Sequence, residues 1–231
     1  MRLREIWRYP VKSMGGERLF GVELGAAGLP GDRLVGVMDR ASRRPDRPLS
    51  ARDVPVLLAF SAVWAGGEAL ISGPGLRLAS HRSPEAAAAV SEACGRRVEL
   101  ADQGAPAFDD SPIHLISFPT LRQLQGELAE EVDPRRFRAN VYLDGGELGP
   151  GEESRWTGQV LEAGQATLVV LGDCPRCAVT TREPGHPERE WPGLLRHLVE
   201  RRAQVMGVYA KVGAPGPLHP GDPVRVISGV A

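Results

Sequence analysis

The sequence has 231 residues, of which 42% are hydrophobic and 25% are charged, a composition that can build a core and excludes a mainly disordered chain. Lys and Arg number 28 against 29 Asp and Glu, so the formal charge of -1 offers no general attraction for nucleic acid, and we expect no nucleic-acid partner. No apolar run approaches the ~20 residues of a membrane span, and the first residues carry charges where a signal peptide is apolar, so we expect no membrane partner and a cytoplasmic location.

Short apolar runs, separated by 20 prolines and 28 glycines, are typical of a β-rich fold with frequent turns. In chain order these runs predict strands over Leu3–Tyr9, Arg18–Leu24, Leu34–Met38, Leu57–Trp64, Leu76–Ala79, Val98–Ala101, Ile113–Ile116, Asn140–Leu143, Thr167–Leu171, Gly207–Val212 and Pro223–Ile227.

Helices are predicted at three places among these strands. Ser83 and Pro84 form a helix start before an alanine run that ends near Cys94. A second helix begins at about Pro119 and places leucines on one face, and a third follows Trp191-Pro192. None of these helices carries residues that suggest chemistry, so we expect them to pack against the strands.

The polar stretch between Ala101 and Phe108 interrupts the apolar pattern. Such an interruption is typical of a connection between folding units. We therefore expect two domains, residues 1–101 and 102–231.

The sharpest local signal is the pair Cys174 and Cys177 after an apolar run that predicts a buried strand. Both cysteines are expected just past the strand end, where functional groups often gather. The spacing fits a thioredoxin-like redox pair, but the residues that follow are a poor helix. A zinc site would need further ligands that have no matching motif. A single thiolate beside Arg176, acting as metal ligand or nucleophile, is a third interpretation, and two small buried hydrophobic residues a fourth.

Several basic residues lie at turns or strand edges. Lys12 and Ser13 stand in a proline and glycine turn that could hold an anion. Arginines in Gly31-Asp32-Arg33, Ser50-Ala51-Arg52 and Arg136-Phe137-Arg138-Ala139-Asn140 could bind phosphate or planar heterocycles, or form surface ion pairs.

Other chemistries have little support in the sequence. His114 lies in a predicted buried strand and is expected to be a satisfied core residue. Asp109 and Asp110 would point to opposite faces of a strand, which makes Ser111 the better candidate for a polar contact. No serine-hydrolase elbow, Walker A loop or dinucleotide fingerprint is present.

These pieces occur in an order that resembles MOSC-domain proteins, a family that includes the C-terminal domain of molybdenum-cofactor sulfurase and the mitochondrial amidoxime reducing component. The matching motifs are Tyr-Pro-Val-Lys-Ser from Tyr9, Gly-Asp-Arg from Gly31, Ser-Ala-Arg from Ser50, Asp-Ser-Pro from Asp110, Arg-Phe-Arg-x-Asn from Arg136, Cys-x-Arg-Cys-x-x-Thr-Thr from Cys174 and Gly-Asp-Pro-Val from Gly221. The resemblance implies an α+β, β-rich fold: a MOSC-type β-barrel over 102–231, an N-terminal β-barrel-like domain over 1–101 and a few packing helices.

The resemblance also implies a molybdenum cofactor of the molybdopterin type, with Cys177 as the catalytic thiolate ligand to molybdenum. By the same resemblance, the residues that bind the cofactor would be Lys12, Ser13, Arg33, Arg52, Ser111, Arg138, Asn140, Thr180 and Thr181.

The activity implied is a molybdenum-dependent oxidoreductase that reduces small N-hydroxylated (N–O) substrates by oxygen-atom transfer. No iron–sulfur segment is visible in the sequence, so electrons would come from a separate donor protein, such as a flavin or iron–sulfur reductase. The alternative is a carrier module that delivers the cofactor or passes sulfur as a persulfide on Cys177.

Overall fold

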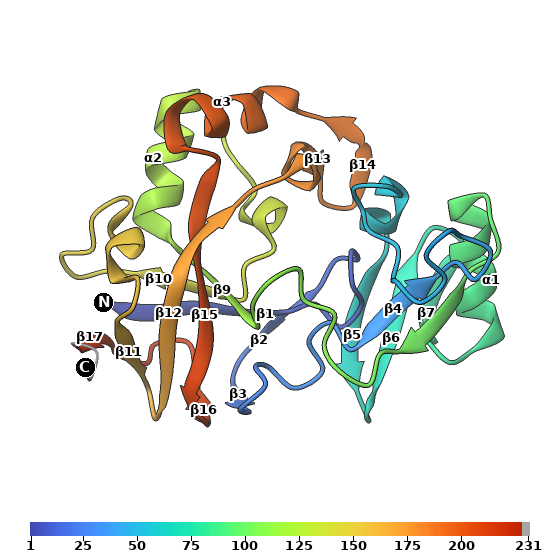
Figure 1. The fold of residues 1–231 in the computed structure, drawn as a ribbon, viewed down its shortest axis with the longest axis horizontal. Helices are drawn as coiled ribbons and strands as arrows, with labels where there is room; N and C mark the ends of the chain where they lie inside the picture. Colours follow the sequence, from blue (N-terminus) through green and yellow to red (C-terminus); the bar gives the residue numbers. More distant parts are fainter. Residues whose placement is uncertain (228–231) are drawn as a thin grey trace.

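The structure of the protein is a computed structural model, which describes residues 1–227. Its largest sheet has 8 strands in the order β17-β11-β12-β15-β9-β10-β1-β2 (Figure 1). These strands are β17 (Val224–Ile227), β11 (Val160–Ala163), β12 (Ala166–Pro175), β15 (Val205–Ala214), β9 (Ile113–Ser117), β10 (Val141–Asp144), β1 (Arg2–Arg8) and β2 (Glu17–Leu19).

This sheet curls until its β17 end meets β1. The amide of Leu3 donates to the carbonyl of Asp222 at 2.9 Å, and the amide of Val224 donates to the carbonyl of Met1 at 3.0 Å. Such contacts join the two ends of the sheet in the manner of a barrel, which protects strand edges from pairing with other chains.

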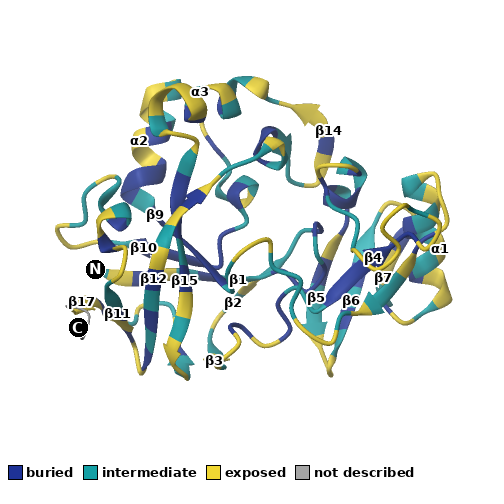
Figure 2. Cartoon of the chain, viewed as in Figure 1, coloured by how far each residue is buried: buried dark blue, intermediate teal, exposed yellow. Residues whose placement is uncertain are grey.

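The interior of this sheet is apolar because its strands direct their buried residues inward. Strand β12 alternates buried and more exposed positions, whereas all of β9 is buried (Figure 2). Leu115, Leu168 and Val208 are among the residues of the resulting core, and each is 1% exposed or less. Burial of this apolar surface is the main force that stabilises the curled sheet.

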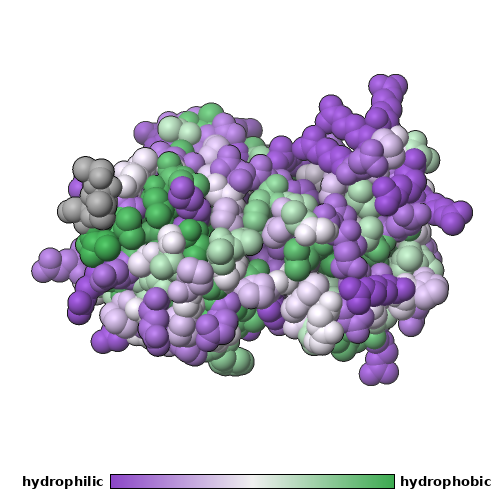
Figure 3. Space-filling model, turned by 60° about the horizontal axis from the view of Figure 1, so that its bottom comes forward, coloured by the Kyte–Doolittle hydropathy of each residue, from purple (hydrophilic) through white to green (hydrophobic). Residues whose placement is uncertain are grey.

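A second, smaller group of strands lies to the right in Figure 1. It contains one sheet of order β5-β6-β7 and a pair β4-β8, with β5 (Ser61–Ala65), β6 (Glu68–Gly73), β7 (Leu76–Ser80), β4 (Val35–Met38) and β8 (Glu99–Asp102). Val35, Phe60, Ile71 and Val90 belong to a separate core between these strands and helix α1 (Pro84–Cys94). The hydrophilic side chains that project at the right of Figure 3 lie on this side of the molecule.

Helices α2 (Phe118–Leu128) and α3 (Pro192–Arg202) lie together at the top of Figure 1. Both helices contribute to a third core that includes Leu124, Tyr142 and Leu198. Helix α2 begins at Ser117, whose side chain accepts from the amide of Thr120 at 3.2 Å, an ordinary N-cap. No helix within residues 1–227 is long and apolar enough to cross a membrane.

Two short strand pairs and four single-turn 3-10 helices complete the described chain. The strand pairs are β13 (Arg182–Glu183) with β14 (His186–Glu190), and β16 (Gly216–Leu218) with β3 (Val22–Leu24). The 3-10 helices are η1 (Pro55–Ala59), η2 (Pro134–Phe137), η3 (Glu152–Trp156) and η4 (Ala178–Thr181). The amide of Gly185 donates to the carbonyl of Leu58 at 3.1 Å, so the β13–β14 turn links the two groups of strands.

The predicted helices and the α+β, β-rich fold class are confirmed. Two strand predictions are wrong in part. Residues 18–24 form two strands, β2 and β3, because each pairs with a different partner. Residues 57–59 belong to η1, since Pro55 starts a helical turn before β5. Strands β6, β11, β13, β14 and β16 were not predicted, because several are short or polar and only pairing defines them.

The division into domains 1–101 and 102–231 stays a prediction, and residues 228–231 of the second range lie outside the described part of the chain. Strand β1 belongs to residues 1–101 in sequence, but in the structure it pairs with β10, which belongs to residues 102–231.

Candidate functional site

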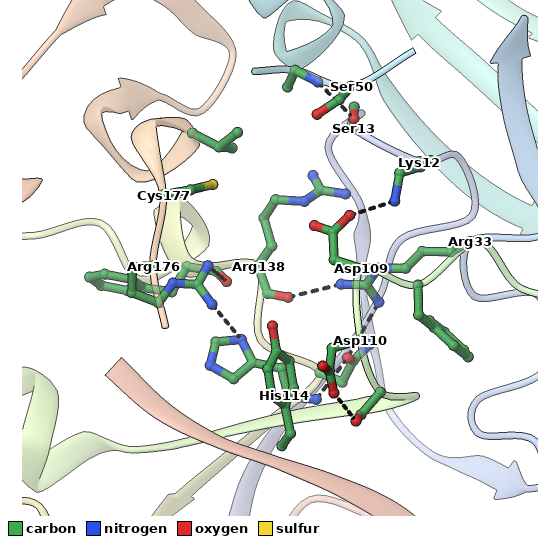
Figure 4. Close-up of a pocket in the computed structure, with 17 residues that line it drawn as sticks. Lys12, Ser13, Arg33, Ser50, Asp109, Asp110, His114, Arg138, Arg176 and Cys177 are labelled. Carbon is green, nitrogen blue, oxygen red and sulfur yellow. Dashed lines mark hydrogen bonds and ion pairs between the residues drawn. The ribbon is translucent and has the colours of Figure 1, made fainter. Parts of the chain in front are cut away.

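Turns and strand ends from distant parts of the chain meet at one pocket between the two groups of strands (Figure 4). The chain after β1, the turn before β4, the loop before β9, the turn after η2 and the end of β12 all contribute side chains. Most of the predicted site residues line this pocket: Lys12, Ser13, Arg33, Ser111, Arg138, Asn140 and Cys177.

The remaining predicted residues lie nearby. Arg52 lines two adjoining pockets and lies 3.6 Å from Asp109. Thr180 and Thr181 are buried and do not line the pocket. Their hydroxyls instead donate to the carbonyls of Cys177 at 2.9 Å and of Ala178 at 2.7 Å. They therefore hold the turn that presents Cys177.

Cys177 stands between the end of β12 and the start of η4. It is partly exposed, and Figure 4 shows its sulfur directed into the pocket. It also lines an adjoining pocket of about 640 Å³, which shares Asp109, Asp110, Arg176 and Tyr209 with the first. The thiol is thus accessible from both spaces.

Cys174 has a different environment, and its predicted position past the strand is wrong. It is a fully buried residue of β12, because β12 continues to Pro175 in its pairing with β15. Burial raises the pKa of its thiol, against the opposing effects of Arg176 and Tyr209. The unequal burial of the two cysteines favours a single accessible thiol over a redox pair.

Arg176 contacts Cys174 in this structure. Its Nη1 donates to the Cys174 sulfur at 2.8 Å, and its Nη2 donates to the carbonyl of Phe137 at 2.8 Å. Its Nε is buried with no hydrogen-bond partner within residues 1–227. An unsatisfied buried donor is costly, so this guanidinium has capacity for an additional acceptor.

A buried carboxylate organises the basic side of the pocket. Asp32 is 0% exposed; it pairs with the guanidinium of Arg33 and accepts from the amide of Tyr9 at 2.7 Å. It also accepts from Asn140 Nδ2 at 3.3 Å. Asp32 belongs to the Gly-Asp-Arg motif but was not among the predicted site residues. It acts by positioning Arg33 and Asn140.

Arg33 and Arg138 both lie over the Tyr9 ring, with their guanidinium carbons 5.1 Å and 4.4 Å from its centroid. Burial, followed by the nearby charge of Arg33, lowers the pKa of Arg138 to about 10. Burial raises the pKa of Tyr9 to about 12, so its hydroxyl stays protonated at neutral pH. Two like charges held this closely favour a bound anion.

The backbone at the pocket is unusual. Ser13, Arg33 and Arg138 have φ values of 69°, 53° and 54°, a left-handed conformation that is uncommon for residues with a side chain. Such conformations cost free energy and persist where surrounding contacts hold them. For Ser13, one such contact is the amide of Ala51, which donates to its hydroxyl at 2.9 Å.

Lys12 and Asp109 form an ion pair of 2.7 Å at the pocket wall. Burial lowers the pKa of Lys12, against the opposing effect of Asp109. For Asp109, burial alone would raise the pKa, but the hydrogen bond and charge of Lys12 outweigh it and lower the pKa. The ion pair with Lys12 therefore stabilises the charged form of the Asp109 carboxylate.

His114 is buried, as expected, and it also lines the pocket, which the sequence did not predict. Its Nε2 lies 2.9 Å from the carbonyl of Met206, and its Nδ1 lies 3.5 Å from Arg176 Nη1. Burial, followed by the charge of Arg176, holds the pKa of His114 well below its ordinary value. A neutral His114 donates to Met206 and leaves Nδ1 as an acceptor facing Arg176. Tyr209, which no sequence motif signalled, lines the same wall.

No group of three or more His, Cys, Asp and Glu side chains within the described residues could hold a metal ion. A metal at this pocket would therefore take few ligands from the protein, with Cys177 as the accessible thiol donor.

Two protein-family models match this chain. The family model described as "MOSC domain" matches residues 87–225 of the chain. The chain belongs to the MOSC family. A second model, "MOSC N-terminal beta barrel domain", matches residues 1–111.

This MOSC protein is similar in sequence to two mammalian proteins and in fold to a bacterial crystal structure. It is 34% identical to the rat protein "Mitochondrial amidoxime reducing component 2" and 28% identical to the bovine protein of that name, each over 130 residues. The match covers 50% of this chain and 37% of each relative, so it spans well under half of their length. The fold is similar to the crystal structure of the YUAD protein from Bacillus subtilis, with a TM-score of 0.55, 15% identity and coverage of 99% of this chain and 96% of that one.

Proposed function

We propose that the protein binds a molybdenum cofactor in the pocket around Cys177 and reduces small N-hydroxylated substrates. The observation that carries this proposal is the convergence of one accessible thiol with Lys12, Arg33 and Arg138 on a single pocket. A soft metal ligand and an anion-binding wall together suit a metal held by a phosphate-bearing organic cofactor.

The residues present fit that cofactor. A soft thiolate such as Cys177 suits a metal that is also bound by dithiolene sulfur. Guanidinium groups at Arg33 and Arg138 suit phosphate oxygens, and the left-handed turns at these residues keep both groups on the pocket wall. The buried Nε of Arg176, which has no partner among residues 1–227, can donate to a further acceptor. The adjoining 640 Å³ pocket leaves room for a substrate beside Cys177.

When bound, the cofactor would supply two-electron oxygen-atom transfer, in which the substrate oxygen would leave as water once a donor had supplied two electrons and two protons. The protein's own groups would bind and orient it. Cys177 would ligate the metal, Lys12 and the arginines would hold the phosphate, and Asn140 would be kept in place by Asp32. Arg176 and the neutral His114 would keep a fixed hydrogen-bonding wall beside the thiol.

The substrate class and the electron donor rest on the relatives. Two curated proteins with partial similarity are named amidoxime reducing components, and amidoximes are N-hydroxylated compounds. We infer that this chain acts on small N-oxygenated molecules and receives electrons from a separate donor protein.

The second candidate is a carrier module that holds the cofactor, or a persulfide on Cys177, without turnover. The accessible thiol at Cys177, next to the buried Cys174, supports this alternative. A persulfide needs an accessible thiol and a supplied sulfur donor rather than a substrate pocket.

The test is the molybdenum and pterin content of protein purified from a host that makes the cofactor. We expect near-stoichiometric molybdenum in the natural chain, its loss in Cys177→Ser and its retention in Cys174→Ser, where the serine hydroxyl can still accept from Arg176. Folding of all three proteins is checked by thermal unfolding.

Equal loss of metal in both variants would contradict the single-ligand assignment and favour a dithiol site. Absence of molybdenum from repeated, well-folded preparations would contradict the proposed molybdenum-dependent activity. A mass increase of one sulfur atom on Cys177 in such preparations would support the carrier module. With metal present, turnover of an N-hydroxylated amidine with added reductant separates the enzyme from a cofactor carrier.

A further inference from the structure

A second cavity lies beside the candidate cofactor pocket, between the chain after β1, helix η1 and the β13–β14 turn. Its volume is about 220 Å³. It shares Arg138 and Val179 with the cofactor pocket but is not lined by Cys177. Strand β14 packs against η1, and the amide of Gly185 donates to the carbonyl of Leu58 at 3.1 Å. We call this second cavity the arginine cavity.

Positive charge dominates its wall. Arg135, Arg136, Arg138 and Arg182 line the arginine cavity, and no Asp or Glu within residues 1–227 does. Two of these arginines form ion pairs with carboxylates that do not line the cavity: Arg135 with Asp133 at 2.6 Å and Arg182 with Glu190 at 3.2 Å.

The other two, Arg136 and Arg138, have no carboxylate within 4.0 Å among residues 1–227. Arg136 donates from Nη1 to the carbonyl of Thr181 at 3.0 Å, and Arg138 donates from Nη1 to the carbonyl of Met14. Each guanidinium therefore keeps further N–H groups without a charged acceptor. Partly buried cations without a counter-charge favour an anion in the space that they face.

The rest of the wall is aromatic and apolar. Trp7, Tyr9 and Phe60 line the cavity together with Leu58. The rings of Trp7 and Tyr9 are nearly parallel, at 19°, with centroids 6.5 Å apart. Walls of this kind bind flat apolar groups, and a few fixed polar groups set their orientation.

The volume limits the size of the ligand. A cavity of about 150 Å³ holds benzene, whereas pockets for larger ligands usually start at about 300 Å³. The 220 Å³ of the arginine cavity thus suits one ring with a small substituent. A guanidinium fork matches the planar carboxylate in geometry as well as charge.

We propose that the arginine cavity binds a single aromatic ring that carries a carboxylate, with the carboxylate on Arg136 and the ring among Trp7, Tyr9 and Phe60. The cavity shares Arg138 with the cofactor site of the proposed function, but Arg136 does not line that site, so the proposed carboxylate contact is separate from it.

The experiment is isothermal titration calorimetry of the purified full chain with benzoate, benzamide and inorganic phosphate, with molybdenum measured in the same samples. Benzamide keeps the ring without the charge, and phosphate keeps the charge without the ring. We expect benzoate to bind at least about tenfold more tightly than either, because each lacks one of the two interactions. Equal binding of benzoate and benzamide, equal binding of benzoate and phosphate, or no binding of benzoate would overturn the proposal.

Variants localise the binding. Arg136→Gln should weaken benzoate by at least about tenfold, since it removes a charged hydrogen-bond donor. Arg189→Gln is the matched control, because Arg189 lies on β14, is 65% exposed and does not line the cavity. Ala59→Leu narrows the cavity and leaves all its arginines in place, so it should also weaken benzoate binding.

Unchanged benzoate affinity in Ala59→Leu would place the ligand elsewhere, even if Arg136→Gln did not fold. Loss of molybdenum in a folded Arg136→Gln would make the cavity part of the cofactor site and overturn the proposal. A chain that binds benzoate but contains no molybdenum would contradict the proposed function and support this inference.

Discussion

The buried carboxylate of Asp32 offers the most direct test of how the pocket is held together. Asp32 is 0% exposed, and the side chain of its partner Arg33 is 14% exposed. Asp32→Asn keeps the shape of the side chain and one oxygen to accept from the amide of Tyr9. It removes the negative charge opposite Arg33 and places an amide donor where Arg33 or Asn140 now donates.

The magnitude follows from this burial. Removal of one partner from a buried ion pair costs about 3–5 kcal/mol, because the other charge is left without compensation. Since asparagine retains one acceptor, we expect a loss of unfolding free energy near the lower end, about 3 kcal/mol. A surface pair would contribute only about 0–1 kcal/mol.

The assay is urea unfolding followed by tryptophan fluorescence, in low and in high salt. Asp46→Asn is the control, because the Asp46 side chain is 98% exposed and should change stability by less than about 0.5 kcal/mol. Salt should leave the Asp32→Asn effect nearly unchanged, since buried pairs are little screened. A loss below about 1 kcal/mol, or one that disappears in high salt, would refute a buried organising role for Asp32.

Two further predictions concern charges at the same pocket. Arg138→Ala should weaken cofactor retention by about 1.5–3 kcal/mol if the guanidinium contacts phosphate directly, measured as molybdenum per chain after gel filtration; full retention would remove Arg138 from the cofactor site. The pKa of His114 lies well below its ordinary 6.5, so below that pH the unfolded chain binds a proton that the native chain does not. The free energy of unfolding should therefore fall by up to about 1.4 kcal/mol per pH unit below pH 6.5. His114→Gln should remove this part of the pH dependence, measured by urea unfolding between about pH 7 and about pH 5. An unchanged pH dependence in the variant would contradict a buried neutral His114.

The two sides of the pocket are stabilised in different ways. On one side, Asp32 supplies a compensating charge for Arg33, and the Tyr9 ring supports Arg33 and Arg138. On the other side, Arg176 donates to Cys174 and to a carbonyl, and its Nε has no partner in the described part of the chain. Fixed positive groups of this kind would favour the anionic cofactor that we propose, because they need not rearrange when it binds.

Local features of the sequence were sufficient to predict the three helices. Helix α1 starts at Ser83, whose hydroxyl accepts from the amide of Ala86 at 3.1 Å, and ends at Gly95 in a left-handed conformation. These signals depend on residues within a few positions of one another, so they can be read without knowledge of the fold. The ordered motifs likewise indicated the MOSC family, which the match over residues 87–225 confirms.

The tertiary structure determined the strand boundaries and the exposure of the two cysteines, because both depend on strand pairing and burial. Residues Val160–Ala163 became a strand because β12 and β17 pair with them on both sides. Strand β12 extends through Cys174 because β15 continues to pair with it, which buries Cys174 and leaves Cys177 as the accessible thiol.

The convergence of Lys12, Arg33, Arg138 and Cys177 also needed the folded chain, since each comes from a different turn. Sequence motifs named these residues, but contacts between distant segments determine which side chains face one another. Arg176 illustrates the difference. It lies between the two cysteines in sequence, and one interpretation of the sequence placed it beside a single thiolate acting as metal ligand or nucleophile; in the structure its Nη1 donates to the sulfur of the buried Cys174.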